Sequence, residues 1–334
     1  MLPELFRIPF LNLPIYGYGL MLVLGFLGAQ GLAKVLARRT GIDPEFFDNA
    51  TLVALVAGVV GARLSHVLEN LDVYTNPARS AWANFVDAIN ITSGGLTFYG
   101  GFLLAFLACG IYAARQQVPL RHLLDIAAPC VLIGLGLGRV GCFLNGCCYG
   151  AECSVPWAVR YPYHSVPYTE QFDRGRIQPP RELIAETSRG ERLVDPKVAK
   201  AAGNAQLIEQ MRDQHSLPVH PAQLYSTFTA LLLAGVCVAY FTLPHVAGRV
   251  MALMLMLEGP SRFILEMLRA EPPVIGRGTE HLAALPPMSL SMVIGLLLCL
   301  AGVVLWFALG RRPVYHPGIA GNPGVKTPIP TQTA

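Results

Sequence analysis

Long apolar runs, separated by shorter polar segments, dominate the pattern of hydrophobic and polar positions along the chain. A run of about 20 apolar residues with few charges is long enough to cross a bilayer as one helix. Gly and Leu recur in these runs without the alternation expected of a membrane β-barrel. The pattern predicts an all-α polytopic membrane protein with about seven transmembrane helices, near residues 15–37, 49–69, 92–114, 122–144, 221–243, 248–269 and 287–309.

One long polar stretch interrupts this pattern between the fourth and fifth predicted spans. Residues 151–220 hold 18 of the 46 charged side chains, which are 25 Lys and Arg and 21 Asp and Glu. We expect a small external cap of α+β or irregular structure here, with a strand at 156–159 and a helix at 197–212. The predicted organisation is transmembrane helices in 1–144, the cap in 145–220, transmembrane helices in 221–310 and a disordered, proline-rich tail in 311–334.

Composition excludes several classes of protein. Charged residues make up 14% of the chain, whereas a soluble domain carries about 25%. An ordinary soluble enzyme is therefore excluded. Nucleic-acid binding is also excluded, because a net charge of +4 spread over this chain forms no basic stripe. A hydrophobic content of 53% excludes general disorder.

The charges of the short loops predict an orientation through the positive-inside rule. With the N-terminus outside and the C-terminus inside, the inner loops and the tail would hold Lys34, Arg38, Arg39, Arg115, Arg121, Arg249, Arg311, Arg312 and Lys326. The outer loops would hold Arg7, Arg79, Arg269 and Arg277. The polar segment then lies outside, and the tail is cytoplasmic.

This orientation places the polar side chains of different spans at one depth, since each helical residue adds 1.5 Å along the axis. The side chains expected in the outer half of the bundle are Tyr18, Arg63, His66, Tyr99, Arg139, Asn145, Gln223, Arg262 and Glu266. The inner half has almost nothing comparable. A transmembrane ion or proton pathway needs polar groups at all depths, so the pattern does not favour one.

Three of these residues, Arg63, Arg139 and Arg262, need anions, because an arginine at the centre of a span costs about 2.5–3.5 kcal/mol on insertion scales. The guanidinium group meets a phosphate with a planar, two-pronged set of donors. Phospholipid headgroups are the abundant anions at this depth. Carboxylates are the alternative for Arg262, with Glu258 and Glu266 at i−4 and i+4 on the same helical face.

Glycines gather around two of the polar positions. Gly134, Gly136, Gly138 and Gly141 surround Arg139, and four more glycines flank the segment that contains Tyr99. Glycines let a neighbouring helix or a lipid chain approach the backbone closely. Together with the arginines, they predict a lipid-binding site.

Six short stretches, in order along nearly the whole chain, resemble motifs of the bacterial prolipoprotein diacylglyceryl transferase family. Each is short, but six at the corresponding spans make the resemblance specific. The stretches are Tyr18–Leu20, Gly61–Arg63, Gly94–Gly101, Gly138–Gly146, His220–Tyr225 and Arg262–Glu266, with Arg269 beyond the last.

The resemblance implies an enzyme of the bacterial cytoplasmic (inner) membrane. Its expected reaction moves the diacylglyceryl group of phosphatidylglycerol to the lipobox cysteine thiol of a prolipoprotein signal peptide, forming a thioether and releasing glycerol phosphate. The reaction requires an anion site, two insoluble reactants held in register, and removal of a proton from a thiol whose pKa is about 8.5. It implies no metal and no soluble cofactor, and its partners are membrane lipid and prolipoproteins.

The resemblance also assigns site residues. The expected catalytic residues are Tyr99, Arg139 and Arg262; the expected substrate-binding residues are Tyr18, Arg63, Asn145, Gly150, His220, Gln223 and Glu266. This chain departs from the family at three positions. Tyr99 stands where most members have His, Cys142 where they have Asn, and Cys147 where many have Glu.

Four cysteines within twelve residues, Cys142, Cys147, Cys148 and Cys153, leave two interpretations open. Zinc is disfavoured because the spacing lacks paired Cys-x2–4-Cys loops and because Cys142 is expected inside a span. A disulfide that closes the loop over the site is favoured, since this segment faces an oxidising compartment.

Three other classes of function remain alternatives. A catalytically inactive paralogue that binds lipid or preprotein is the strongest, because of Tyr99. A membrane thiol-redox protein would use the cysteines but leaves the arginines unexplained. A transporter would be indicated by internal repeats and interrupted helices, which this sequence does not show.

Overall fold

The computed structural model describes residues 4–8, 13–75, 80–90, 95, 97–187, 190–269, 288–310 and 314–315. Its helices and short hairpins belong to two compact units that alternate along the sequence. The first unit consists of Met1–Ala29, Ala128–Tyr240 and Met251–Arg311. The second unit consists of Gln30–Ala127, Phe241–Val250 and Arg312–Ala334.

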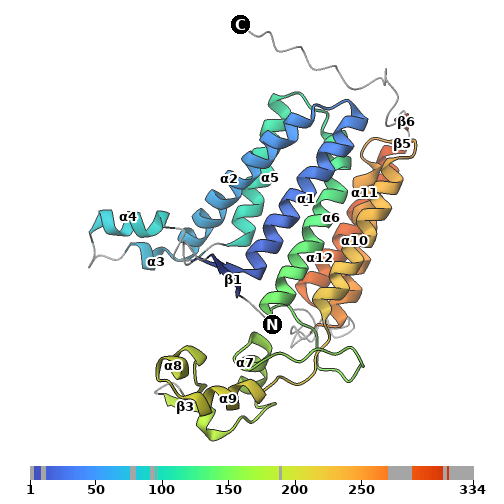
Figure 1. Ribbon diagram of the computed structural model, residues 1–334. Helices are drawn as coiled ribbons and strands as arrows, with labels where there is room; N and C mark the ends of the chain where they lie inside the picture. The colour runs from blue at the N-terminus through green and yellow to red at the C-terminus, as the bar shows by residue number, and fades with distance from the viewer. Residues whose placement is uncertain are drawn as a thin grey trace, which may run out of the picture. The chain divides into compact units, whose positions relative to one another are not determined.

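Long helices form most of the first unit (Figure 1). They are the N-terminal half of α1 (Gly17–Thr40), most of α6 (Leu120–Asn145), α10 (Ala222–Phe241), α11 (Arg249–Met267) and α12 (Leu290–Leu309). A hairpin of β1 (Glu4–Ile8) and β2 (Leu13–Tyr16) precedes α1.

Small residues allow the helices of the first unit to pack closely. A Cβ atom added at Gly259 of α11 would lie 2.4 Å from the carbonyl oxygen of Gly295 in α12. Between α6 and α10, the Thr227 hydroxyl donates a hydrogen bond to the Gly136 carbonyl at 3.1 Å. Such close backbone contacts are typical of helices in lipid. Apolar side chains gain little by moving from lipid into a helix interface, so close packing and hydrogen bonds drive the association of the helices.

The second unit is built around a pair of helices, α2 (Pro44–Glu69) and α5 (Phe98–Arg115), joined through α3 (Leu71–Tyr74) and α4 (Ala81–Ile89). Gly61 and Gly100 face each other across the pair, and a Cβ at Gly61 would lie 2.5 Å from the Gly100 carbonyl oxygen. Helix α2 starts with an Asp43 side chain that accepts from the Glu45 N–H at 2.9 Å, which is a normal N-cap.

Charged side chains also connect helices and loops of the second unit. In α1, Lys34 forms an ion pair with Asp48 of α2 at 2.8 Å. Asp125, near the start of α6, accepts a hydrogen bond from the Gly248 N–H at 2.6 Å and lies 3.6 Å from His245 Nε2. His245 belongs to β5 (His245–Val246), which pairs with β6 (Val314–Tyr315).

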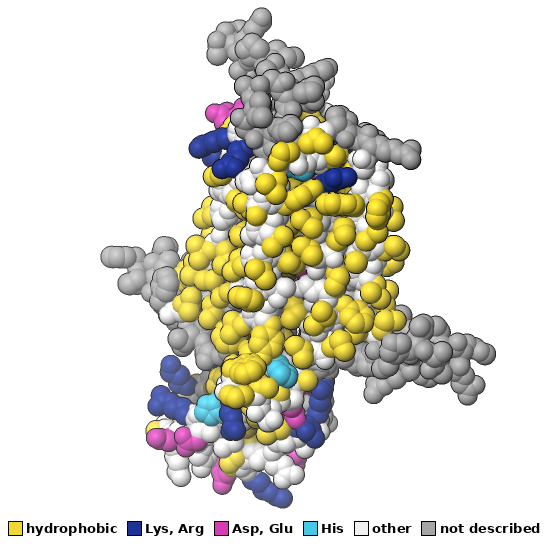
Figure 2. Space-filling model, turned by 90° about the vertical axis from the view of Figure 1, so that its right-hand side faces the viewer, with side chains coloured by type: hydrophobic (Ala, Val, Ile, Leu, Met, Phe, Trp, Pro, Cys, Tyr) yellow, Lys and Arg dark blue, Asp and Glu magenta, His cyan; other side chains and the backbone are white. Residues whose placement is uncertain are grey.

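Five helices are long and apolar enough to cross a membrane: α1, α2, α6, α10 and α12. Helices also occupy the other two predicted stretches, as α5, whose apolar part is the shorter Gly100–Arg115, and α11. Helix α11 differs because Glu258, Arg262 and Glu266 lie within it. Figure 2 shows a broad area of hydrophobic side chains on one face of the molecule. The protein is a helix-rich, polytopic membrane protein, as the sequence predicts.

The polar segment after α6 folds into short elements with a small core. Its elements are α7 (Val166–Asp173), the 3-10 helix η1 (Arg181–Leu183), β3 (Ile184–Thr187), β4 (Gly190–Leu193), α8 (Pro196–Ala201) and α9 (Ala205–Asp213). Strands β3 and β4 form an antiparallel hairpin. The core of this segment consists of Tyr163, Tyr168, Leu183, Ala199 and Met211.

Two local predictions for this segment were wrong. The helix predicted at 197–212 is two helices, α8 and α9, because the chain turns at Gly203, whose φ is +67°. The strand predicted at 156–159 is a turn, and only Val159 forms a bridge, with Val219. Pro156 supplies no N–H for a ladder, which favours the turn.

Of the predicted disordered tail, the described residues are Val314–Tyr315, which form β6.

Candidate functional site

The ends of five helices meet at one end of the first unit. The start of α1 packs on the end of α6, since a Cβ at Gly17 would lie 3.0 Å from Leu144 Cδ1. The end of α11 joins the start of α12 through Arg262 Nη2, which donates to the Ser291 hydroxyl at 3.2 Å. Starts and ends of successive helices thus lie together. This arrangement brings the polar residues predicted for α1, α6, α10 and α11 into one region.

A narrow cleft lies in this region. It is lined by Arg139, Cys148, Ala222, Ser226, Glu258, Arg262, Leu265, Glu266 and Arg269. The cavity measures about 20 Å³, room for about one water molecule. Three guanidinium groups and two carboxylates therefore line a small polar cleft, and a larger ligand has to move these side chains apart.

Arg269 is the third arginine of the cleft, and the sequence analysis did not assign it to the site. It follows α11 and lies 3.7 Å from Glu266, Nη1 to Oε2. Glu266 is buried, with 6% of its surface exposed, and it forms an ion pair with Arg269. The signal was present in the spacing, because residues 262, 266 and 269 are i, i+4 and i+7 on one helical face.

Tyr18 lies near Arg139, and Asn145 ends the helix that carries Arg139. Tyr18 packs over Gly141 of α6, where an added Cβ would be 3.0 Å from Tyr18 Cδ2. Arg139 and the neighbouring cysteines lie near enough to act electrostatically on the Tyr18 hydroxyl. Asn145 is the exposed last residue of α6, and Gly146 ends the helix with a φ of +75°.

Gly150 and His220 sit where three segments of the first unit pair by backbone hydrogen bonds. The Gly150 N–H donates to the His220 carbonyl at 2.9 Å, and Gly150 also forms a bridge with Arg269. A Cβ at Gly150 would lie 2.6 Å from His220 Cβ and 2.7 Å from the Leu268 carbonyl oxygen. Only glycine fits this crossing, which holds the loop after α6 against the end of α11.

Gln223, predicted to bind substrate, is fully buried at the start of α10. Its Nε2 donates to the Cys147 carbonyl at 2.7 Å and to the Tyr161 hydroxyl at 3.0 Å. Burial raises the pKa of Tyr161 to about 12, so the phenol stays neutral and able to accept this hydrogen bond. Gln223 thus supports the loop that carries Cys147.

Arg63 belongs to the second unit and is also buried, with 6% exposed. Its guanidinium donates to the carbonyls of Asp87, Ala88 and Gly95 at 2.6, 2.8 and 2.9 Å. Its Cζ lies 5.3 Å from the centre of the Tyr74 ring. The structure therefore shows Arg63 holding together the backbone between α4 and α5.

Tyr99 lies in the first turn of α5, in the second unit, and its side chain is outside the described residues. The backbone around it is tied to α2, because the Thr97 N–H donates to the Ala62 carbonyl at 3.0 Å. The Thr97 hydroxyl donates to Glu69 at 2.9 Å. The catalytic role predicted for Tyr99 stays a prediction.

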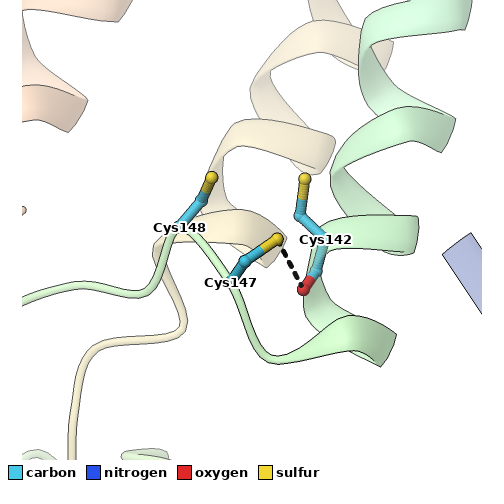
Figure 3. Close-up of side chains that lie close together, drawn as sticks. All are labelled: Cys142, Cys147 and Cys148. Carbon is cyan, nitrogen blue, oxygen red and sulfur yellow. Dashed lines mark hydrogen bonds between the residues drawn. The ribbon is translucent and has the colours of Figure 1, made fainter. Parts of the chain in front are cut away.

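Three thiols of the first unit gather beside the cleft. The sulfur atoms of Cys142, Cys147 and Cys148 all lie within 4.8 Å of one another (Figure 3). The thiol of Cys147 points back to the Cys142 carbonyl oxygen at 3.7 Å. Hydrogen bonds with Cys142 and Cys147, and the charges of Arg139 and Arg269, lower the pKa of the Cys148 thiol.

The disulfide predicted for this segment is absent from the described residues, in which all eight cysteines of the chain are free thiols. Cys153 lies outside the cluster, and its N–H pairs with the Pro218 carbonyl at 3.0 Å. The cluster is therefore an odd set of three sulfur atoms rather than a pair. The sequence analysis discounted Cys142 because it was expected inside a span, whereas its place in the last turn of α6 brings its sulfur within 4.8 Å of those of Cys147 and Cys148 (Figure 3).

Comparison with known proteins shows which family this chain matches. Residues 3–308 match the family model described as prolipoprotein diacylglyceryl transferase. Two relatives of that kind, each named phosphatidylglycerol–prolipoprotein diacylglyceryl transferase, match over nearly their whole length. The protein from Corynebacterium efficiens is 27% identical over 94% of this chain and 86% of its own length. The protein from Chromobacterium violaceum is 28% identical over 90% of this chain and 93% of its own.

A third relative with the same name, from Rhodopirellula baltica, is more similar over a shorter stretch. It is 35% identical over 164 residues, which are 49% of this chain and 33% of that protein. The matched part of this chain thus corresponds to about a third of the Rhodopirellula protein.

Proposed function

Because this chain belongs to the prolipoprotein diacylglyceryl transferase family, we propose that its arginine-lined cleft is the site at which phosphatidylglycerol reacts. The protein is a transferase that moves the diacylglyceryl group of phosphatidylglycerol to prolipoproteins. The acceptor atom is the thiol of the lipobox cysteine in the signal peptide. The observation that carries this assignment is the meeting of Arg139, Arg262 and Arg269 at one cleft.

The chemistry fits a cleft of this charge. The cysteine thiolate attacks the glycerol carbon that bears the phosphate, a carbon–sulfur bond forms, and the carbon–oxygen bond breaks. Glycerol phosphate leaves with that electron pair and carries one more negative charge than the phosphodiester had. Guanidinium groups of Arg139 and Arg262 stabilise this growing charge with two-pronged hydrogen bonds.

The other residues of the first unit have positioning or binding roles in this proposal. Tyr18, near Arg139, and Asn145, at the end of α6, contact the lipid headgroup or the peptide. Gly150, with the His220 backbone, sets the path of the loop after α6, and Gln223 holds that loop in place. Glu266 fixes the Arg269 guanidinium through its ion pair.

Arg63 and Tyr99 belong to the second unit, and their proposed roles rest on the family resemblance. Arg63 acts as a positioning residue, since its three hydrogen bonds to carbonyls hold the backbone that leads from α4 into α5. The Tyr99 hydroxyl donates a hydrogen bond to a phosphate oxygen. A tyrosine has a pKa of about 10, which makes it a poor proton acceptor at neutral pH without strong help from cations.

The proposed setting is the bacterial inner membrane, with seven spanning helices, N-terminus outside and C-terminus inside. Residues 145–220 then form a cap on the outer side, where prolipoprotein signal peptides present their cysteine. The loop-charge asymmetry supports this orientation.

Transfer of label tests the proposal. The purified protein is incubated with phosphatidylglycerol labelled in its acyl chains and with a lipobox peptide, or with the same peptide carrying serine in place of cysteine. We expect label on the cysteine peptide alone, as a thioether. Lipid binding without transfer would show an inactive paralogue instead, and label on neither peptide would overturn the assignment.

A further inference from the structure

The three clustered thiols have the spacing of a metal site. Zinc–sulfur bonds of about 2.3 Å place the sulfur atoms of a tetrahedral site about 3.8 Å apart. The sulfur atoms of Cys142, Cys147 and Cys148 already lie within 4.8 Å of one another, so rotations of side chains suffice to close the remaining gap. Thiolates are the ligands that zinc and other soft metals prefer.

The loop that carries two of these thiols is held in an unusual conformation. Cys148 has a φ of +58°, a left-handed conformation that costs energy for a residue with a Cβ atom. The Cys147 N–H donates to the Cys142 carbonyl at 3.1 Å, and its own carbonyl accepts from the buried Gln223. In metal sites, hydrogen bonds from residues that are not ligands commonly hold the ligands in the orientation that the metal requires.

We propose that Cys142, Cys147 and Cys148 bind a zinc ion whose fourth coordination position takes the thiol of the prolipoprotein substrate. Three protein ligands and one open position are the arrangement of catalytic zinc sites. We place the open position toward the reaction cleft, because Cys148 lines that cleft together with Arg139 and Arg262. This inference rests on the proposed function for the identity of the fourth ligand.

Zinc would supply the deprotonation that Tyr99 is poorly suited to provide. A thiol bound to zinc releases its proton, here to water, and remains bound as a thiolate. The thiolate then attacks the glycerol carbon, the carbon–sulfur bond forms, and glycerol phosphate leaves with the electrons of the carbon–oxygen bond. Three protein thiolates and Zn²⁺ sum to a charge of −1, and Arg139 and Arg269 lie near enough to Cys148 to offset it.

Metal content provides the first test. The full-length protein is purified under reducing conditions, loaded with Zn²⁺, desalted and analysed by mass spectrometry for zinc per chain. We expect about one zinc, lost in Cys142→Ser, Cys147→Ser and Cys148→Ser but retained in the matched control Cys153→Ser. Elution as a single detergent-bound species shows that each variant is folded. Zinc retained in Cys142→Ser, or a disulfide among the three cysteines in the active protein, would overturn the site.

Binding of the substrate thiol provides the second test. Cd²⁺ in place of zinc gives an ultraviolet charge-transfer band whose intensity reports the number of bound thiolates. A lipobox peptide should raise the band by about a third, since a fourth thiolate joins three. The serine peptide should leave it unchanged. An unchanged band with both peptides would overturn the open position, whatever the transfer assay shows.

Activity separates this inference from the proposed function. Chelation of the metal should lower transfer at least tenfold, and Zn²⁺ should restore it. Full transfer by a protein shown to hold no zinc would overturn the metal role and leave the transferase assignment intact. Zinc binding together with the cadmium response, but without transfer, would instead contradict the proposed function.

Discussion

At the scale of single residues, the proposed chemistry depends on the arginines and Tyr99. Arg139, Arg262 and Arg269 line one cleft, whereas Arg63 donates to three backbone carbonyls of the second unit. The four arginines therefore have different surroundings, and we expect different roles for them. Substitution should separate them.

The first prediction concerns Arg139. Arg139→Lys should lower transfer on the order of tenfold to a hundredfold, because a point charge replaces a planar, two-pronged donor at the phosphate. The measurement is initial-rate transfer of labelled lipid to the peptide. Arg192→Lys, at an exposed position in β4, is the matched control and should transfer at the parent rate. Parent-rate transfer by Arg139→Lys would contradict the phosphate role.

The second prediction concerns Arg63. A lysine there offers one ammonium group and cannot reach the three carbonyls that the guanidinium serves, so buried acceptors lose their donors. We expect Arg63→Lys to lower the thermal unfolding midpoint in detergent, with a milder loss of transfer than Arg139→Lys causes. A large loss of transfer at an unchanged unfolding midpoint would instead show direct contact with substrate.

The third prediction concerns Tyr99. Tyr99→Phe keeps the ring and removes the hydroxyl, and transfer should fall on the order of tenfold through loss of an anion donor or proton-transfer group. Tyr99→His should keep substantial activity, because it restores the usual family residue. Both are measured at saturating phosphatidylglycerol with folded protein. Unchanged transfer by the Phe variant would remove Tyr99 from the site.

At the scale of elements, glycine contacts determine how the helices fit together and hence where the site residues lie. Helices α11 and α12 touch at Gly259 and Gly295, and the end of α11 supplies Arg262 and Glu266 to the cleft. A change in the spacing of these two helices therefore moves the arginine cleft.

The fourth prediction tests this coupling. In Gly259→Ala the new Cβ would lie 2.4 Å from the Gly295 carbonyl oxygen, which neither backbone can avoid without moving. We expect a destabilisation of about 1–3 kcal/mol, typical of overpacking, together with reduced transfer. Gly235→Ala in α10, where nothing lies within 4 Å, is the control and should be neutral or stabilising. Equal unfolding midpoints in detergent for the two variants would contradict the packing argument.

At the scale of the whole molecule, orientation in the membrane decides which compartment meets the cleft. The loop charges predict that the segment 145–220 and the site end of the first unit face outward. A substrate whose signal peptide has been exported would then reach the thiol cluster from the outer side. This arrangement is tested by finding which positions an impermeant reagent labels from outside the cell.

The fifth prediction is therefore topological. In a variant without native cysteines, Arg79→Cys and Glu191→Cys should each react with an impermeant maleimide in intact cells, whereas Arg121→Cys should react only after lysis. Labelling is read on the purified chain. The reverse pattern would place the cap and the cleft on the cytoplasmic side and overturn the proposed orientation.

The sequence by itself determined the membrane character and the positions of most helices. A bilayer requires each span to satisfy its own backbone and to present apolar side chains over about 20 residues, so this information is local. Helices occupy all seven predicted stretches, and α1, α2, α6, α10 and α12 are long and apolar enough to cross. The family motifs likewise sit in contiguous segments and can be read without a fold.

Only the tertiary structure decided which polar groups meet. Gly150 pairs with Arg269, and Gln223 is directed to the Cys147 carbonyl, through contacts between segments remote in sequence. The thiol cluster depends on the left-handed turn at Cys148, which no composition or spacing rule predicts for a cysteine. Such contacts arise from the packing of helices and from backbone angles set by many neighbours, and a pattern along one chain does not contain them.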